Sequence, residues 1–171
     1  MSIINRLPTA NESPDSTNGV PGDVAVSSPT NTGHASTLSS ASGVGSSHQR
    51  SCRWHTFENL LVGTRLSTKL KLTHSSDGTL VGPSPSNTFQ LSYTLNGGTN
   101  WTHVVDRSNF EDAEGPTNEE ISLPTNQDLT QFQVRDIIEA FSLDAGDTAE
   151  SAATVSNIKI EIEVATPSFL D

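Results

Sequence analysis

Hydrophobic and polar residues alternate along several segments after residue 50, and a period of two predicts β-strands that each bury one face. The clearest is segment 155–164, whose apolar side chains are predicted to point inward (Ile158, Ile160, Ile162 and Val164). In segment 88–95 the same alternation leaves Gln90, Ser92 and Thr94 facing outward. Shorter strands are predicted around Trp54 and Ile121. The other residues predicted to face inward are Leu66, Thr68, Leu70 and Leu72 in 64–74, Phe89, Leu91, Tyr93 and Leu95 in 88–95, and Phe132 and Val134 in 130–137.

Helical periodicity is scarce. Segment 135–141 could form a turn or two of helix, or could continue the strand before it. Alternation with one polar face is typical of antiparallel sheets, and several such strands must pack together to bury their apolar faces. The sequence therefore predicts an all-β protein, an antiparallel β-sandwich or jelly roll of about seven or eight strands.

The first fifty residues differ in composition from the rest of the chain. They contain no Phe, Trp or Tyr, and 29 of the 50 are Ser, Thr, Gly, Pro or Asn. So little apolar area cannot offset the entropy of ordering the segment by itself. We interpret residues 1–50 as an extended, low-complexity N-terminal arm and residues 51–171 as the β-sandwich domain. The arm is either a flexible tail or a segment that orders on a partner, anchored by Ile3, Ile4 and Leu7.

One turn stands out between two predicted strands. In SYTLNGGTNWTHV (92–104), Asn96, Gly97 and Gly98 tolerate the positive φ that tight hairpin turns require, so the segment predicts a β-hairpin. The turn is either a structural element of the fold or part of a ligand site.

The wider spacing of this hairpin resembles the Asp-box of sialidases and of many extracellular β-sandwich modules, through Thr94, Asn96, Gly98 and Trp101. The resemblance implies a structural role, in which Asn96 bonds the turn amides and Trp101 packs across the hairpin. A single copy excludes a propeller of repeated blades. Over 51–164, this hairpin with LTQFQVRD and VSNIKIEIEV also resembles galactose-binding-like jelly-roll modules.

No pattern for catalysis occurs in the chain. The five histidines have no metal-binding spacing, and neither a Gly-x-Ser-x-Gly elbow nor a phosphate loop is present. We therefore expect a protein without enzymatic activity and without a cofactor. Structural calcium is the alternative, because two acidic loops offer oxygen ligands, with Asp106, Asp112, Asp144 and Asp147 as candidates.

Net charge and cysteine content limit the kinds of partner and the cellular compartment that we expect. The formal net charge is −11, and residues 108–171 hold 14 acidic residues against two basic ones, which argues against a nucleic-acid-binding face. The single cysteine, Cys52, excludes an internal disulfide. No segment approaches the ~20 apolar residues of a membrane span, and the N-terminus lacks the features of a secretory signal. We expect folding in the cytoplasm, with neither nucleic acid nor membrane as a partner.

A β-sandwich without signal or disulfide, preceded by a long low-complexity arm, resembles the head decoration, head-fibre and tail-accessory proteins of tailed bacteriophages. The resemblance implies a structural virion protein assembled in the host cytoplasm. Its arm would bind other virion proteins of the capsid or tail, and its sandwich would face outward in a homo-oligomer. The alternative is a carbohydrate-binding or adhesive module, which would need Tyr93 and Trp101 as an exposed aromatic platform for glycans.

Overall fold

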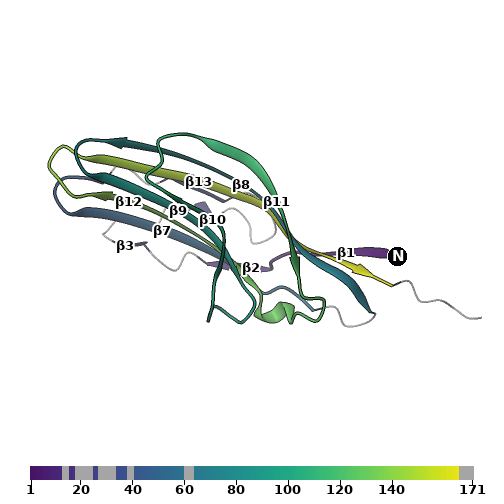
Figure 1. The fold of residues 1–171 in the computed structure, drawn as a ribbon. Coiled ribbons are helices and arrows are strands. Elements are labelled where there is room, and N and C mark those ends of the chain that lie inside the picture. Colours follow the sequence, from purple (N-terminus) through teal and green to yellow (C-terminus); the bar gives the residue numbers. More distant parts are fainter. Residues whose placement is uncertain (13–15, 18–24, 27–33, 38–40, 60–63, 166–171) are drawn as a thin grey trace, which may run out of the picture.

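The computed structural model describes residues 1–12, 16–17, 25–26, 34–37, 41–59 and 64–165, and this described part contains no α-helix (Figure 1). Two antiparallel sheets pack face to face, which confirms the all-β sandwich predicted from the alternation. In chain order the elements are β1 (Ser2–Arg6), β2 (Ala10–Glu12), β3 (Ser16–Thr17), β4 (Ala25–Val26), β5 (His34–Thr37), β6 (Ala41–Ser42), β7 (Ser46–His55), β8 (Arg65–Val81), β9 (Pro85–Thr94), β10 (Thr102–Ser108), β11 (Glu114–Leu123), the 3-10 helix η1 (Leu129–Gln131), β12 (Gln133–Ser142) and β13 (Thr148–Val164).

The eight principal strands pair in a nested order. β1 pairs with β13, β7 with β12, β8 with β11 and β9 with β10, so that each antiparallel pair encloses the next one along the chain. The principal strands of sheet A follow the order β1-β13-β8-β11, and those of sheet B follow β7-β12-β9-β10. Nested pairs distributed over two sheets in this way make a jelly roll. The strand pairing thus decides between the two architectures that the sequence left open.

The core lies between the two sheets, where the alternation predicts it. The inward residues of β13 are at most 8% exposed, and Phe89, Leu91, Phe132 and Val134 are fully buried. Segment 135–141 is part of β12, with every second residue buried, so it continues the strand and forms no helical turn.

Three residues depart from the predicted burial. Leu66 is predicted inward but is exposed, because it lies at the start of β8, where the register with β13 shifts. Ser92 and Thr94 are predicted outward but are buried. Local hydrogen bonds account for both, since Ser92 Oγ bonds to His103 Nδ1 and Thr94 Oγ1 bonds to the amides of its own turn.

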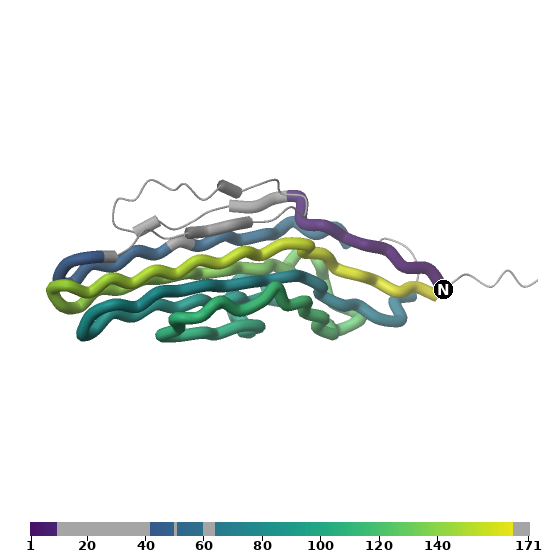
Figure 2. The backbone as a smooth tube through the Cα atoms, turned by 90° about the horizontal axis from the view of Figure 1, so that it is seen from above, coloured from purple at the N-terminus to yellow at the C-terminus, as the bar shows by residue number. Residues whose placement is uncertain are grey.

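The described parts of the first fifty residues form strands along the edges of both sheets. β1, β5 and β6 pair with successive parts of β13, β4 pairs with β5, and β2 and β3 pair with β7. Such pairing covers backbone groups that a long edge strand would otherwise leave free. In Figure 2 β1 and the start of β8 lie on either side of the end of β13, at one end of an elongated molecule. The domain boundary drawn at residue 50 falls within β7.

A buried asparagine connects the two sheets near the opposite end. Asn87 of β9 donates from Nδ2 to Phe110 O (2.9 Å) and to Glu150 O of β13 (2.7 Å), and its Oδ1 accepts from Phe110 N (2.9 Å). Gly78 of β8 packs against this side chain, and a Cβ there would lie 2.5 Å from Asn87 Nδ2. Only glycine leaves room for the asparagine, so these two residues are matched across the interior.

Candidate functional site

The hairpin at 95–101 is closed by its own side chains. Thr94 Oγ1 accepts hydrogen bonds from the amides of Asn96 (3.3 Å) and Gly98 (3.2 Å) and donates to Asn96 Oδ1 (2.9 Å). Asn96 Oδ1 also accepts from Asn100 N at 3.0 Å. Gly97 and Gly98 have φ values of 69° and 95°, which only glycine adopts freely. The two side-chain oxygens are therefore engaged inside the turn, which is the geometry of a structural element.

Trp101, the last residue of the Asp-box-like pattern, packs against the outer face of sheet B. The guanidinium carbon of Arg135 lies 4.1 Å from the ring centroid of Trp101, and that of Arg53 lies 6.0 Å away. Tyr93 instead packs against the core and stacks on Phe132, with 6.0 Å between the ring centroids. The structure therefore does not bring Tyr93 and Trp101 together as one aromatic platform.

The residues predicted to anchor the arm lie in and just after β1. Ile4 is opposite Ile162 in the pairing with β13 and packs against the core of its own chain. Ile3 points to the other face of the sheet and is 64% exposed, and Leu7 is half-buried. Within one chain Ile4 thus stabilises the fold, and Ile3 remains available for a contact with a partner.

The first acidic loop is held by an arginine. Arg107 NH2 donates to Asp112 Oδ1 at 2.6 Å, Arg107 Nε lies 3.0 Å from Glu114 Oε2, and NH1 donates to Ser76 Oγ at 2.7 Å. Asp106, the other candidate of this loop, accepts from Gln90 Nε2 at 3.2 Å. The carboxylates that the sequence offered to calcium are bonded here to the chain's own donors.

The second acidic loop centres on a buried carboxylate that joins two loops. Asp147 is 1% exposed, and its Oδ1 accepts from the amide of Ser84 at 3.0 Å. Its Oδ2 accepts from the amides of Leu143 (3.1 Å) and Asp144 (2.8 Å). Among the described residues no group of three His, Cys, Asp or Glu side chains is placed to hold a metal ion.

This carboxylate makes the stability of the fold depend on pH. Burial alone raises the pKa of Asp147, but the amide hydrogen bonds favour the carboxylate and hold its pKa below the usual range. A folded-state pKa below the unfolded one means that the stabilisation is complete above about pH 4 and is lost as the pH falls toward the folded-state pKa. We expect urea midpoints to fall more steeply between about pH 5 and about pH 3 in the wild-type chain than in Asp147→Asn. Parallel pH profiles would contradict this role.

The outer face of sheet A carries a ladder of opposite charges. Lys69 and Lys71 of β8 both contact Glu120 of β11, and Lys71 also lies 3.0 Å from Glu161 of β13. The hydrogen bond to Glu161 raises the pKa of Lys71, and the hydrogen bond from Lys69 lowers that of Glu120. These groups neutralise one another. A hollow of about 500 Å³ beside them is lined by Lys71, Leu72, Thr73, Asn118, Glu119, Glu120, Asn157 and Lys159.

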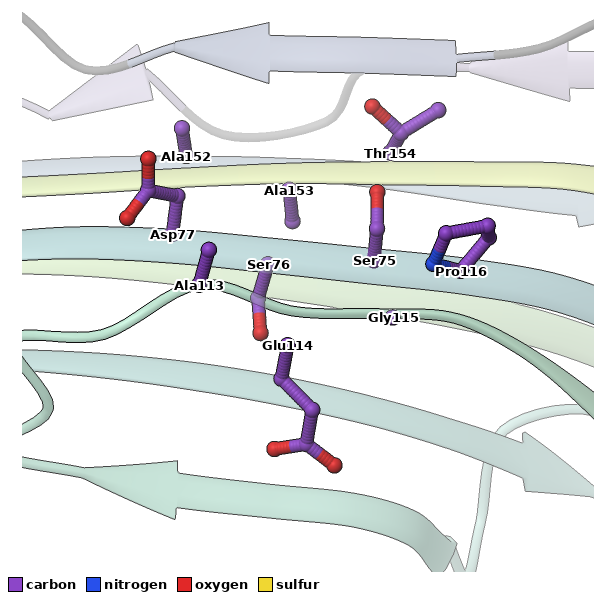
Figure 3. Close-up of a pocket in the computed structure, with 10 residues that line it drawn as sticks. All are labelled: Ser75, Ser76, Asp77, Ala113, Glu114, Gly115, Pro116, Ala152, Ala153 and Thr154. Carbon is purple, nitrogen blue, oxygen red and sulfur yellow. The ribbon is translucent and has the colours of Figure 1, made fainter.

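A second hollow, of about 300 Å³, lies where β11 departs from β8 (Figure 3). The register of β11 shifts between Glu114 and Thr117, which opens the space between the strands. Small side chains dominate, and the carboxylate of Asp77 already accepts from the amide of Gly78 at 2.8 Å. Nothing in this lining points to a particular chemistry; it consists of Ser75, Ser76, Asp77, Ala113, Glu114, Gly115, Pro116, Ala152, Ala153 and Thr154.

Arg53 and Arg135 were not singled out by the sequence, because they are far apart along the chain and each looks like an ordinary outward residue of a strand. The available signal was that each stands between two inward residues of an alternating segment. Their proximity depends on the pairing of β7 with β12, which no local pattern specifies.

Comparison with known proteins assigns the chain to no family. No protein-family model matches the chain, and no curated protein matches its sequence. One similar solved structure is that of infectious bursal disease virus, Gx strain, at 15% sequence identity and a TM-score of 0.24. That comparison covers 80% of this chain, which spans only 37% of the viral chain. No helix in the described part is long and apolar enough to cross a membrane.

Proposed function

We propose that the chain is a non-enzymatic structural protein of a virus particle, which joins copies of itself to other virion proteins. Its finer assignment is an accessory protein of a tailed bacteriophage. Jelly rolls occur in capsid proteins and in lectins, so the fold is compatible with both functions and does not distinguish them. The observation that carries the proposal is the pair of exposed apolar clusters at opposite ends of the molecule.

The first cluster lies at the end where the chain begins. Met1, Ile3 and Leu66 are exposed there. Ser2 is opposite Val164, and Val164 is opposite Arg65, so the start of β1 and the start of β8 flank the same residue of β13. A group of large exposed apolar side chains on a polar surface is typical of a contact site. We assign this end to the anchoring contact of the N-terminal arm.

The second cluster lies on the loops at the other end, where Val44, Val81 and Leu143 are exposed. Ser142 Oγ donates to Gly43 O, which places the residues before Leu143 and Val44 side by side. Thr148 is opposite both Val81 and Ser42, which adds the end of β8 to the same group. A protein with an apolar contact at each end is suited to be anchored at one end and to meet a neighbour at the other.

The test is sedimentation of particles from the cells in which the chain is naturally produced. We expect the chain in the particle fraction of a density gradient, and we expect Ile3→Asp and Leu143→Asp each to reduce that share. Both side chains are exposed, so their replacement should leave the urea midpoint nearly unchanged. Thr102→Asp, which adds the same charge on exposed β10, is the control. A chain that stays at the top of the gradient would refute the proposal.

A further inference from the structure

The hollow of about 500 Å³ on the outer face of sheet A lies over the middle of β8. β8 pairs with β11 on one side and with β13 on the other, so strand pairing occupies both of its edges. None of the eight lining residues is aromatic, and Leu72, which is 2% exposed, turns into the core. A ligand in this hollow is therefore held by polar side chains, because neither a strand edge nor a large apolar surface is offered to it.

A bulge in β13 shapes the hollow. The register of β13 with β8 shifts between Ser156 and Lys159, so two residues of β13 stand where β8 has one. Asn157 in this bulge has a φ of 55°, in the left-handed region that asparagine adopts more readily than most residues. Bulges re-aim side chains, and the amide of this asparagine reaches Thr73 on the neighbouring strand.

Three side chains form a hydrogen-bonded row across the hollow. Asn157 Nδ2 donates to Thr73 Oγ1 at 3.3 Å, and Thr73 Oγ1 donates to Asn118 Oδ1 of β11 at 2.7 Å. The row crosses three strands and so spans about 10 Å. It ends in the amide oxygen of Asn157 on one side and in the amide nitrogen of Asn118 on the other, and each of these groups can make further hydrogen bonds. The row thus presents an acceptor and a donor that it already holds in position.

Charged groups flank the row and cancel one another. Lys71 and Lys159 line the hollow together with Glu119 and Glu120, two charges of each sign. Lys71 Nζ lies 3.1 Å from Glu120 Oε2 and 3.0 Å from Glu161 Oε1, which engages two of its three N–H donors. An ion gains no net attraction from such a lining. An uncharged group that both donates and accepts finds partners of both kinds there.

We propose that this hollow binds a neutral saccharide of two or more rings. Hydroxyl groups both donate and accept hydrogen bonds, which matches the two amide ends of the row and the mixed charges beside it. A width of about 10 Å fits two rings better than one. No aromatic ring lines the hollow for stacking, so the affinity of a single site is weak and multivalent display strengthens it.

This site is separate from the aromatic platform of Tyr93 and Trp101, which the structure does not bring together. It also goes beyond the proposed virion function, since it requires only the folded chain and no assembly.

The test is titration of the isotope-labelled full chain with neutral disaccharides, followed by two-dimensional NMR of the amide groups. The probes are cellobiose, lactose, mannobiose and chitobiose, each up to about 50 mM, which detects dissociation constants in the millimolar range. We expect at least one of them to shift the side-chain amide signals of Asn118 and Asn157 in a saturable way. Sorbitol, an open-chain polyol, is the control at the same concentration and should leave both signals in place.

Replacements with matched controls then locate the site. Asn118→Ala and Asn157→Gly each remove one amide of the row and should weaken binding about fivefold or more. Glycine keeps the left-handed backbone of the bulge. Asn126→Ala makes the first change on an exposed loop, and Asn109→Gly makes the second at an exposed residue with a φ of 52°. Both controls should bind as the wild-type chain does.

Four outcomes would overturn the inference. They are the absence of a shift of the two amide signals with all four disaccharides, an equal shift with sorbitol, unchanged binding by the two row variants, and equal weakening by their controls. Circular dichroism melts of each variant verify that it is folded. Should Asn157→Gly not fold, Thr73→Val takes its place, because it removes the hydroxyl between the two amides, keeps the shape of the side chain and should weaken binding as well.

Discussion

Replacement of Phe132 by alanine should lower the free energy of unfolding by about 4 kcal/mol, the largest effect that we expect from a single substitution. Phe132 is fully buried. Its ring meets Phe57 edge-on at 5.3 Å between centroids and stacks on Tyr93 at 6.0 Å. The truncation removes both contacts and leaves a cavity that the two rigid sheets cannot close. Urea unfolding followed by circular dichroism measures the loss.

Phe141 is the matched control for this prediction. It lies on the same strand, β12, but on the outer face, and it is only half-buried. Phe141→Ala removes the same atoms with less loss of buried area, so it should cost about 1–2 kcal/mol. Equal losses for the two variants would show that the core does not centre on Phe132.

Asn87→Ala should lower the free energy of unfolding by about 3 kcal/mol, because buried polar groups left without partners are expensive. The side chain serves three backbone groups, namely Phe110 N, Phe110 O and Glu150 O. Alanine leaves all three without this partner in the interior, and it also removes a direct link between β9 of sheet B and β13 of sheet A. The urea midpoint is again the measurement.

An exposed asparagine provides the comparison. Asn118 of β11 accepts one hydrogen bond from Thr73 Oγ1 at 2.7 Å on the surface, where water replaces it readily. Asn118→Ala should therefore change the free energy of unfolding by no more than about 0.5 kcal/mol. A change of that size for Asn87→Ala as well would mean that its three bonds do not hold the sheets together.

The fold class could be predicted because each strand has a local signal, the alternation of apolar and polar residues. The alternation in β9, β12 and β13 separates the face that packs from the face that does not, and this pattern needs no knowledge of the partner strand. It failed where local hydrogen bonds changed the burial, at Ser92 and Thr94, and where a strand begins, at Leu66. The hairpin at 95–101 was predictable for the same reason, since its hydrogen bonds connect residues close in sequence.

The candidate sites were less predictable, because their partners come from distant parts of the chain. The sequence offers Asp112 as a carboxylate for calcium, and only the fold shows that Arg107 donates to it. Asp147 is another of the calcium candidates, and the amide of Ser84 that donates to it lies in a different loop. In both cases the sequence shows that a carboxylate is present, and only the loop geometry shows which donor it accepts a hydrogen bond from.

The sequence by itself determined which segments become strands, which face of each is apolar, and where one tight turn closes, because these features depend on neighbours within a few residues. The tertiary structure decided the nested jelly-roll pairing, the match between Asn87 and Gly78, and the register that places Arg53 opposite Arg135. Those features depend on register between strands that are distant along the chain. Register is selected by the packing of the whole core, and a pattern with a period of two is compatible with many registers.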